Sequence, residues 1–277
     1  MLADLHIHTT CSDGIYTPEQ IVDKALELHL AAIAITDHDN VDGYLVAQDY
    51  INKYHLPLTL VPAIEIDTET VEHRPVHVLG YHIDVTNQQL LKGAKWVREG
   101  RVVRITKMVH KLQQLGYKIT MEEVQQEAAG SKSLGRPHIA RILVRKGYFD
   151  VAQAVFDALI ASGRPAYCRQ EKFTPTEAVR LIHAAQGIAV MAHPTEIENT
   201  NVASRELDAA GFDGLEVWHP STIEAHSLEF WYKIALAKGL LMSGGSDFHG
   251  NKGRFPEHLG EFPVLYQNVA SVVKYHQ

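Results

Sequence analysis

Short apolar runs alternate along the chain with stretches in which apolar residues recur every three or four positions. A short apolar run predicts a β-strand, whereas the longer spacing predicts a helix that buries one face. We expect seven strands, within 5–8, 31–36, 58–66, 76–82, 188–193, 213–218 and 240–246. Helical spacing is found at 18–29, 41–54, 175–186, 203–211 and 223–238. Strands that alternate with helices usually run parallel, and a ring of such strands predicts an α/β protein with a TIM-like barrel.

Histidines and carboxylates stand at or just beyond the ends of these apolar runs. In Leu5-His6-Ile7-His8 the side chains alternate, so both imidazoles point to the same face of a strand. The later runs lead in turn to His38, Glu65, His193, Glu216 or His219, and Asp247. Only His77 stands near the start of its run. Because barrels of this class keep their active site at the carboxyl ends of the strands, we expect these side chains to meet there.

The residue types at these positions indicate a metal centre. Imidazoles and carboxylates suit manganese, zinc or iron. The two cysteines, Cys11 and Cys168, form no closely spaced pair of the kind that structural thiolate sites use. The sequence therefore predicts a multinuclear site built from nitrogen and oxygen ligands.

These residues occur in the order in which the PHP (polymerase and histidinol phosphatase) metal-dependent phosphoesterases carry their motifs. The motifs are His6-x-His8 with Asp13, Thr36-Asp37-His38, Glu65, His77, His193-Pro194, and Asp247-Phe248-His249. The chain resembles that family over most of its length. The resemblance implies a distorted (β/α)7 barrel, in agreement with the seven apolar runs.

The resemblance also implies three metal sites that share nine side chains, with Glu65 bridging two of the metals. The three ligand sets are His6, His8, Glu65 and Asp247; Glu65, His77 and His193; and Asp13, His38 and His249. We expect manganese, with zinc or iron as alternatives. Asp37, Asp39 and Glu216 are expected to support the ligands rather than to bind metal.

Such a centre suits the hydrolysis of phosphate esters. Three carboxylates against three divalent ions leave an excess of about three positive charges, which attracts phosphate. We expect a hydroxide held between two metals to attack the phosphorus. The residues expected to take part in catalysis are His193, Asp247 and His249. His193 or His249 would protonate the leaving oxygen, or would serve as a ligand only.

A basic segment interrupts the predicted barrel between its fourth and fifth strands. Residues 92–146 hold 13 Lys or Arg and 4 Asp or Glu, although the whole chain of 277 residues carries a net charge of −7. Helical spacing predicts helices near 88–115, 121–128, 137–146 and 151–161. We expect residues 1–90 and 174–277 to form the barrel and 91–173 to form an inserted helical cap. Most basic side chains of the first helix, such as Arg101, Arg104, Lys107 and Lys111, are expected to be solvated.

A position over the metals would let this basic insert bind a polyanion. The stretches Gly135-Arg136-Pro137-His138 and Gly163-Arg164-Pro165 resemble the PHP subgroup that includes RNase AM and the 3′,5′-nucleoside bisphosphate phosphatases. That resemblance implies a phosphorylated nucleotide or short oligonucleotide as substrate, rather than long duplex nucleic acid. The expected substrate contacts are Arg136, His219 and Ser221, with Arg164, His138 and Lys172 as weaker candidates.

Three other functions fit part of the same sequence. A histidinol-phosphate phosphatase would share the metal ligands but would not need a basic insert. An amidohydrolase often places a lysine after its fourth strand, and no lysine lies between Lys53 and Lys92. A non-catalytic accessory module would tolerate eroded ligands, whereas this set is complete. No signal segment or long apolar run is present, so we expect a cytoplasmic protein without membrane contact, of open oligomeric state.

Overall fold

Two β-sheets form the centre of the computed structural model, which describes residues 1–128, 134–197 and 199–275. The first sheet has the strand order β3-β2-β1-β9 and the second has the order β4-β5-β6-β7-β8. The strands of the first sheet are β1 (Leu2–Ile7), β2 (Leu30–Ile35), β3 (Thr59–Val61) and β9 (Val264–Leu265). Those of the second are β4 (Ala63–Glu69), β5 (Pro75–Tyr81), β6 (Ile188–Met191), β7 (Gly214–Trp218) and β8 (Leu241–Gly244).

The predicted closed barrel is not confirmed. In the described residues, backbone pairing between the two sheets is limited to isolated bridges, one between Ile7 of β1 and Phe248 and one between His38 and Glu65 of β4. On the edge of β1 that is opposite β2, the short strand β9 pairs with Leu2 and Ala3 in the place that β8 would take in a closed barrel. The fold is therefore a mixed α/β arrangement of two sheets that converge at one end.

The expectation that all main strands run parallel is wrong for β5. This strand is antiparallel to both of its neighbours, β4 and β6, whereas β6, β7 and β8 are mutually parallel. In the β4–β5 pair, Asp67 is opposite His77. The start of β5 therefore lies at the same end of the sheet as the end of β4, where the two sheets converge.

One apolar run that the sequence presents as a single strand supplies a strand to each sheet. The run 58–66 is divided at Pro62, which has no N–H to donate to a strand ladder. β3 pairs with β2 before the proline, and β4 pairs with β5 after it. The break lets the chain leave the first sheet and enter the second.

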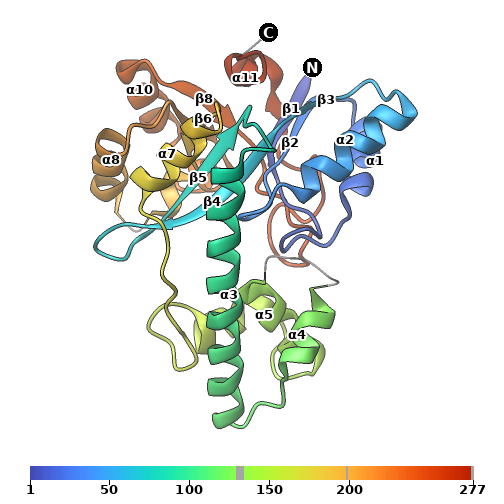
Figure 1. The fold of residues 1–277 in the computed structure, drawn as a ribbon, viewed down its shortest axis with the longest axis vertical. Coiled ribbons are helices and arrows are strands. Elements are labelled where there is room, and N and C mark those ends of the chain that lie inside the picture. The colour runs from blue at the N-terminus through green and yellow to red at the C-terminus, as the bar shows by residue number, and fades with distance from the viewer. Residues whose placement is uncertain (129–133, 198, 276–277) are drawn as a thin grey trace.

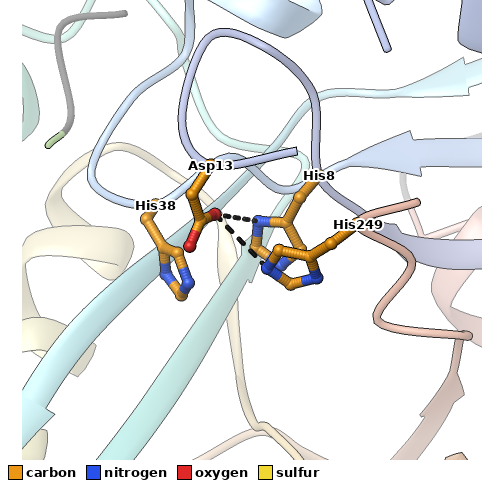
Figure 2. A group of neighbouring side chains, drawn as sticks. All are labelled: His8, Asp13, His38 and His249. Atoms are coloured by element: carbon orange, nitrogen blue, oxygen red, sulfur yellow. Dashed lines mark ion pairs between the residues drawn. The ribbon is translucent and has the colours of Figure 1, made fainter. Parts of the chain in front are cut away.

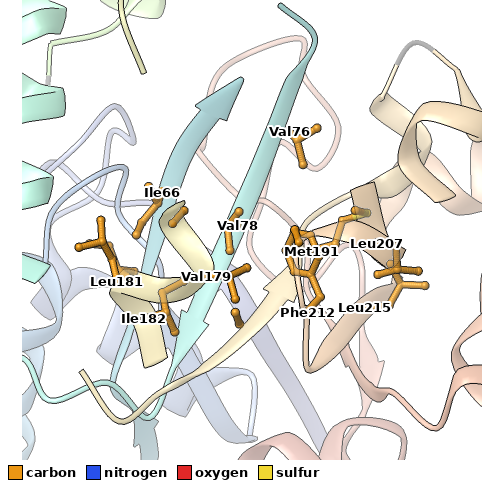
Figure 3. Packing of buried hydrophobic residues seen from close by; sticks show 14 of the residues in the cluster. Ile66, Val76, Val78, Val179, Leu181, Ile182, Met191, Leu207, Phe212 and Leu215 are labelled. Carbon is orange, nitrogen blue, oxygen red and sulfur yellow. The ribbon is translucent and has the colours of Figure 1, made fainter. Parts of the chain in front are cut away.

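Helices cover the outer faces of both sheets, as Figure 1 shows, except the last helix, α11 (Tyr266–Val273), which packs on the apolar cluster between the sheets. Those outside the insert are α1 (Pro18–Glu27), α2 (Asp42–Tyr54), α7 (Pro175–Ala184), α8 (Thr200–Ala209), α9 (Pro220–Glu224), α10 (Leu228–Lys238) and α11, with a single turn at Pro194–Glu196. Val179 and Ile182 of α7 pack on Val78 of β5 in one apolar cluster (Figure 3). A second cluster fills the space between the sheets and joins Leu5 of β1 to Leu79 of β5.

The basic segment forms a helical lobe beside the sheets. Its helices are α3 (Gln88–Gln114), α4 (Met121–Glu127), α5 (Arg136–Arg145) and α6 (Ala152–Val155), with a π turn at Phe156–Ile160. The long helix α3 starts against the second sheet and extends into the lobe, at the end of the molecule away from both termini (Figure 1). Ile105 of α3, Ile139 and Leu143 of α5, and Ile160 belong to a separate apolar cluster. Within the described ranges, none of the helices has the length and apolarity that a membrane span requires.

We predict that the lobe depends on its own core for stability. Leu143 is fully buried in that cluster, whereas Leu115, at the end of α3, is 48% exposed. Leu143→Ala is expected to lower the free energy of unfolding by about 2–5 kcal/mol, because it leaves a cavity in a packed core. Leu115→Ala is expected to change it by about 0.5 kcal/mol or less. Urea denaturation measures both, and equal midpoints for the two variants would contradict the prediction.

Candidate metal centre

Glu65 lies at the centre of a group of histidines where the two sheets converge. It is the third residue of β4 and is 1% exposed. Its Oε2 atom is 3.4 Å from His6 Nε2, 3.2 Å from His8 Nε2 and 3.1 Å from His38 Nδ1. Its Oε1 atom is 2.9 Å from His77 Nδ1 and 3.2 Å from His193 Nε2. The two oxygens of one carboxylate therefore face different sets of imidazoles, as a bridging ligand would.

Asp247 adds a second carboxylate on the side of β1. Its Oδ1 atom is 3.4 Å from His6 Nε2 and 3.1 Å from His8 Nε2. Its backbone has φ of 51°, a left-handed conformation that non-glycine residues rarely adopt and that is often found at functional sites. His6, His8 and Asp247 are close enough to hold one cation together.

Another group of four side chains lies next to His6, His8 and Asp247, and Figure 2 shows the four facing one another. It consists of His8, Asp13, His38 and His249. Asp13 Oδ1 is 3.3 Å from His249 Nε2 and 4.0 Å from His8 Nδ1. The sequence-based prediction assigns Asp13, His38 and His249 to this group. It places His8 only in the set with His6, Glu65 and Asp247. In the structure the two ring nitrogens of His8 face different groups.

The residues present suit metal ions because many of their polar atoms are buried without a hydrogen bond. In the described part of the chain these atoms include His6 Nε2, both ring nitrogens of His8, Asp13 Oδ1, His38 Nδ1, Glu65 Oε2 and His193 Nδ1. Buried polar atoms are nearly always satisfied in native proteins, since each unpaired one is costly. Divalent cations at these positions would satisfy nitrogen and oxygen atoms together.

Hydrogen bonds to Glu216 orient two of the candidate ligands, His6 and His193. Glu216 of β7 is fully buried, and its Oε1 atom is 3.0 Å from His6 Nδ1. Its Oε2 atom accepts a 2.7 Å hydrogen bond from the backbone N–H of His193. A carboxylate that accepts the Nδ1–H of His6 leaves Nε2 unprotonated on the side of Glu65. Asp37 accepts bonds from Thr9 and thereby fixes the loop that carries Asp13.

The carboxylates hold protons on some of these histidines when no metal is bound. Burial alone would lower the pKa of His8, but Asp247 and Glu65 raise it to about 9. Burial likewise opposes protonation of His77, whereas Glu65 and Asp67 raise its pKa to about 10. A metal that binds these nitrogens must therefore displace protons.

A cavity of about 570 Å³ opens onto this group of ligands. Its lining from the sheet ends includes Asp13, His38, Glu65, His77, His193, Asp247 and His249. Its lining from the insert and the return segment includes Arg101, Arg104, Arg136, Arg141 and Lys172. The cavity therefore has an imidazole and carboxylate floor and a cationic wall.

Arg136 and Arg104 are cations of this wall that lack a carboxylate partner among the described residues. Arg136 contacts the Ile160 carbonyl and the Phe156 ring, and Arg104 donates to the Cys168 carbonyl. Burial, followed by the charge of Arg104, lowers the pKa of Arg136 to about 10. A bound anion would relieve this repulsion.

The expectation that the basic face of the first insert helix is mostly solvated is wrong for two residues. Arg101 and Arg104 are each 7% exposed and point into the cavity, whereas Lys107 is exposed. Helical spacing alone could not distinguish these cases, because the direction of the face depends on how α3 packs against the sheets.

Four of the expected substrate contacts, Arg164, His138, Ser221 and His219, do not line the cavity. Arg164 is exposed, in a turn after α6. His138 is buried, and its Nδ1 accepts the N–H of Gly135 at the start of α5. Ser221 lies in α9, where its hydroxyl and backbone N–H both approach His219 Nδ1. His138 and Ser221 take part in hydrogen bonds at the starts of their own helices instead.

His219 lies beside the metal ligands, with its Nε2 3.9 Å from Asp247 Oδ2. The backbone N–H of Ser221 donates to its Nδ1 over 3.1 Å. Since a backbone N–H can only donate, Nδ1 must be the acceptor, and the ring proton is on Nε2. His219 therefore presents a hydrogen-bond donor toward the candidate metal ligands.

Two residues of the site were not found by reasoning from the sequence. Asp67, on β4, contacts His77 Nε2 over 2.9 Å. It stands two positions after Glu65, so strand alternation could have indicated it. Arg254 pairs with Asp247 Oδ2 from a glycine-containing loop that gives no such signal.

Several known proteins are similar to this chain in sequence or structure. The family model described as the PHP domain matches residues 4–188. A 3′,5′-nucleoside bisphosphate phosphatase of Chromobacterium violaceum is 33% identical over 95% of this chain and 93% of its own length. The 5′-3′ exoribonuclease Rnm of Escherichia coli is 34% identical over 90% of this chain and 85% of its own. A Bifidobacterium adolescentis protein assigned as a metal-dependent phosphoesterase has a solved structure that superposes with a TM-score of 0.85 and 32% identity, over 98% of this chain and 95% of that one.

We predict that Glu65→Gln weakens metal binding by more than about tenfold, because the neutral amide removes the charge and one of the two acceptor oxygens that the histidines share. Metal content per chain after gel filtration measures the loss. Glu229→Gln, at an exposed position of α10, is the control and should bind as the wild type does. Wild-type metal content in Glu65→Gln would show that Glu65 is not a ligand.

We further predict that manganese binds more tightly as the pH rises from about 7 to about 9. His8 and His77 are protonated at the lower pH in the metal-free chain, so binding must release their protons. Titration calorimetry in two buffers of different ionisation enthalpy counts these protons. An affinity independent of pH, with no proton release, would contradict the prediction.

Proposed function

The chain belongs to the PHP family of metal-dependent phosphoesterases, and we propose that it hydrolyses phosphate esters of nucleotides. The substrates would be 3′,5′-nucleoside bisphosphates or short RNA trimmed from its 5′ end. The observation that carries this proposal is the single cavity lined by both the ligand group and the unpaired cations of the insert. A substrate with a second phosphate can occupy both ends of such a cavity.

The ligand groups would hold up to three divalent ions, with manganese the first choice and zinc or iron as alternatives. Glu65 would bridge two of the ions through its separate oxygens. When bound, such ions lower the pKa of water and neutralise charge on phosphoryl oxygens. The nine ligands proposed are His6, His8, Asp13, His38, Glu65, His77, His193, Asp247 and His249.

The protein's own groups would position the reacting phosphate and its leaving oxygen. His219 Nε2–H points toward Asp247 and has no hydrogen-bond partner among the described residues. It can donate to a phosphoryl oxygen, a role that its fixed tautomer supports. His193 and His249 are tightly paired with carboxylates, so we propose that they act as ligands rather than as the acid.

Arg136 and Arg104 would bind the phosphate that does not react. Guanidinium groups form paired, charge-assisted hydrogen bonds with phosphate, and these are stronger in a partly buried site than in water. Arg136 is also the first residue of α5, whose amino-terminal N–H groups favour an anion. Both arginines lack a carboxylate partner in the described chain. A substrate phosphate would therefore supply the anionic acceptor that their guanidinium groups lack.

We propose that residues 91–173 act as a cap that excludes water from the cavity. The separate apolar cluster of this segment supports its folding as a unit, and its arginines close one wall of the cavity. The remaining parts of the chain, 1–90 and 174–277, would carry the metal ligands. A cytoplasmic location, which two cysteines without a disulfide in the described chain would favour, stays a prediction.

The test compares phosphate release from 3′,5′-adenosine bisphosphate, histidinol phosphate and a short 5′-phosphorylated RNA, with manganese present. We expect kcat/KM to be highest for one of the two nucleotide substrates. Arg136→Ala should lower that value by about 10-fold to 100-fold, the effect of losing a charge-assisted hydrogen bond of about 1.5–3 kcal/mol.

Arg164→Ala is the matched control, because Arg164 is exposed and does not line the cavity. It should leave kcat/KM unchanged. Preference for histidinol phosphate, unaffected by Arg136→Ala, would replace the proposed substrate. Absence of hydrolysis with a full complement of metal would favour a non-catalytic accessory role.

A further inference from the structure

Asp67 connects a candidate metal ligand to the helical insert. It lies two residues after Glu65 on β4, opposite His77 in the β4–β5 pair, and it is 5% exposed. Its Oδ1 atom is 2.9 Å from His77 Nε2. The other ring nitrogen of His77, Nδ1, is 2.9 Å from Glu65 Oε1. His77 is thus held between two carboxylates, one in the ligand group and one behind it.

The two segments that connect the insert to the sheets, helix α3 and the segment before α7, each place a cation beside this carboxylate. Arg101, on the outgoing helix α3, has its Nη2 2.9 Å from Asp67 Oδ2. Lys172, on the segment that returns to α7, has its Nζ 2.5 Å from Asp67 Oδ1. Both connecting segments of the insert therefore contact the same buried side chain, Asp67.

Helix α3 and the return segment are also joined to each other by hydrogen bonds near Asp67. Gln170 of the return segment donates to the Val97 carbonyl of α3 over 2.7 Å. Arg104 of α3 donates to the Cys168 carbonyl over 2.8 Å. A movement of the insert relative to the sheets must therefore move Arg101 and Lys172 together.

Arg101 extends the connection to the backbone of Glu65. Its guanidinium donates two bonds to Asp39 Oδ2, at 2.9 and 2.7 Å. The N–H of Asp39 donates to the Glu65 carbonyl, and the N–H of Asp67 donates to Asp39 Oδ1. Two cations and two carboxylates thus form a neutral buried network. Burial alone would raise the pKa of Asp67, but Lys172 and Arg101 hold it well below its usual range.

We propose that Asp67 is a positioning residue through which the docked insert orients His77, so that metal binding and docking of the insert stabilise each other. The inference rests on the proposed role of His77 as a metal ligand. A carboxylate that accepts Nε2–H fixes the ring of His77 and makes it more basic, so that Nδ1 can bind a metal once its proton is displaced. Removal of the insert's cations would leave Asp67 as an uncompensated buried charge and free it to move. By linkage, whatever the insert adds to metal affinity, the metal adds to docking.

The test measures metal affinity and amide hydrogen exchange on the same variants of the full chain. Asp67→Asn keeps the shape of the side chain but removes its charge. Lys172→Gln removes one of the two cations and leaves the Arg101–Asp39 pair intact. Lys107→Gln, at an exposed position of α3, is the control. Circular dichroism confirms that each variant is folded.

In the wild type we expect saturating manganese to slow amide exchange in α3 more than in α10. Helix α10 is the internal reference, because its exchange reports only the general stabilisation that any bound ligand gives. In Asp67→Asn the excess protection of α3 should vanish, and the affinity of one manganese per chain should fall by about 10-fold to 100-fold. Lys172→Gln should lose part of both effects. Lys107→Gln should behave as the wild type.

A folded Asp67→Asn with wild-type affinity, or with unchanged excess protection of α3, would overturn this inference alone. Wild-type protein that binds manganese but protects α3 and α10 equally would do the same. Wild-type protein that binds no metal would overturn the proposed function and this inference with it. Because neither readout uses a substrate, an error in the substrate class would leave the result intact.

Discussion

The carboxylate of Glu65 lies where five imidazole rings converge, and the arrangement of the fold follows from that contact. A buried charge is stable only with compensating charge and hydrogen bonds, and the rings of His6, His8, His38, His77 and His193 provide it from both sheets. The sheets are joined at this end by the bridge between His38 and Glu65. The chemistry of the site and the contact between the two sheets therefore depend on the same few atoms.

The alternation of apolar runs and helical stretches was sufficient to place most of the strands and to indicate candidate ligands near their ends. His77 shows what that pattern lacks, since it stands at the start of its run while the other ligands stand at or beyond the ends of theirs. Strand direction resolves the difference, because β5 is antiparallel and its start lies at the end of β4. A list of residues carries no strand direction, so the parallel barrel was expected where two mixed sheets exist. The break at Pro62 could have been read in advance, since proline interrupts a strand ladder.

The substrate side of the cavity was harder to predict, because it depends on packing between distant segments. Arg101 and Lys107 lie on the same basic helix, yet one is buried against Asp39 and the other is exposed. Ser221 and His138 were expected to touch substrate because of their motifs, but both complete hydrogen bonds of nearby helix starts. Local sequence patterns therefore predicted which side chains meet where the sheets converge better than which side chains of the insert line the cavity.

Anomalous diffraction from crystals grown with manganese and phosphate would test the central role of Glu65 most directly. The account predicts separate manganese peaks on the two sides of its carboxylate, one near His6 and His8 and the other near His77 and His193, with one oxygen toward each. A third peak is expected among Asp13, His38 and His249. A single peak bound by both oxygens of Glu65, or peaks only outside this group, would contradict the account.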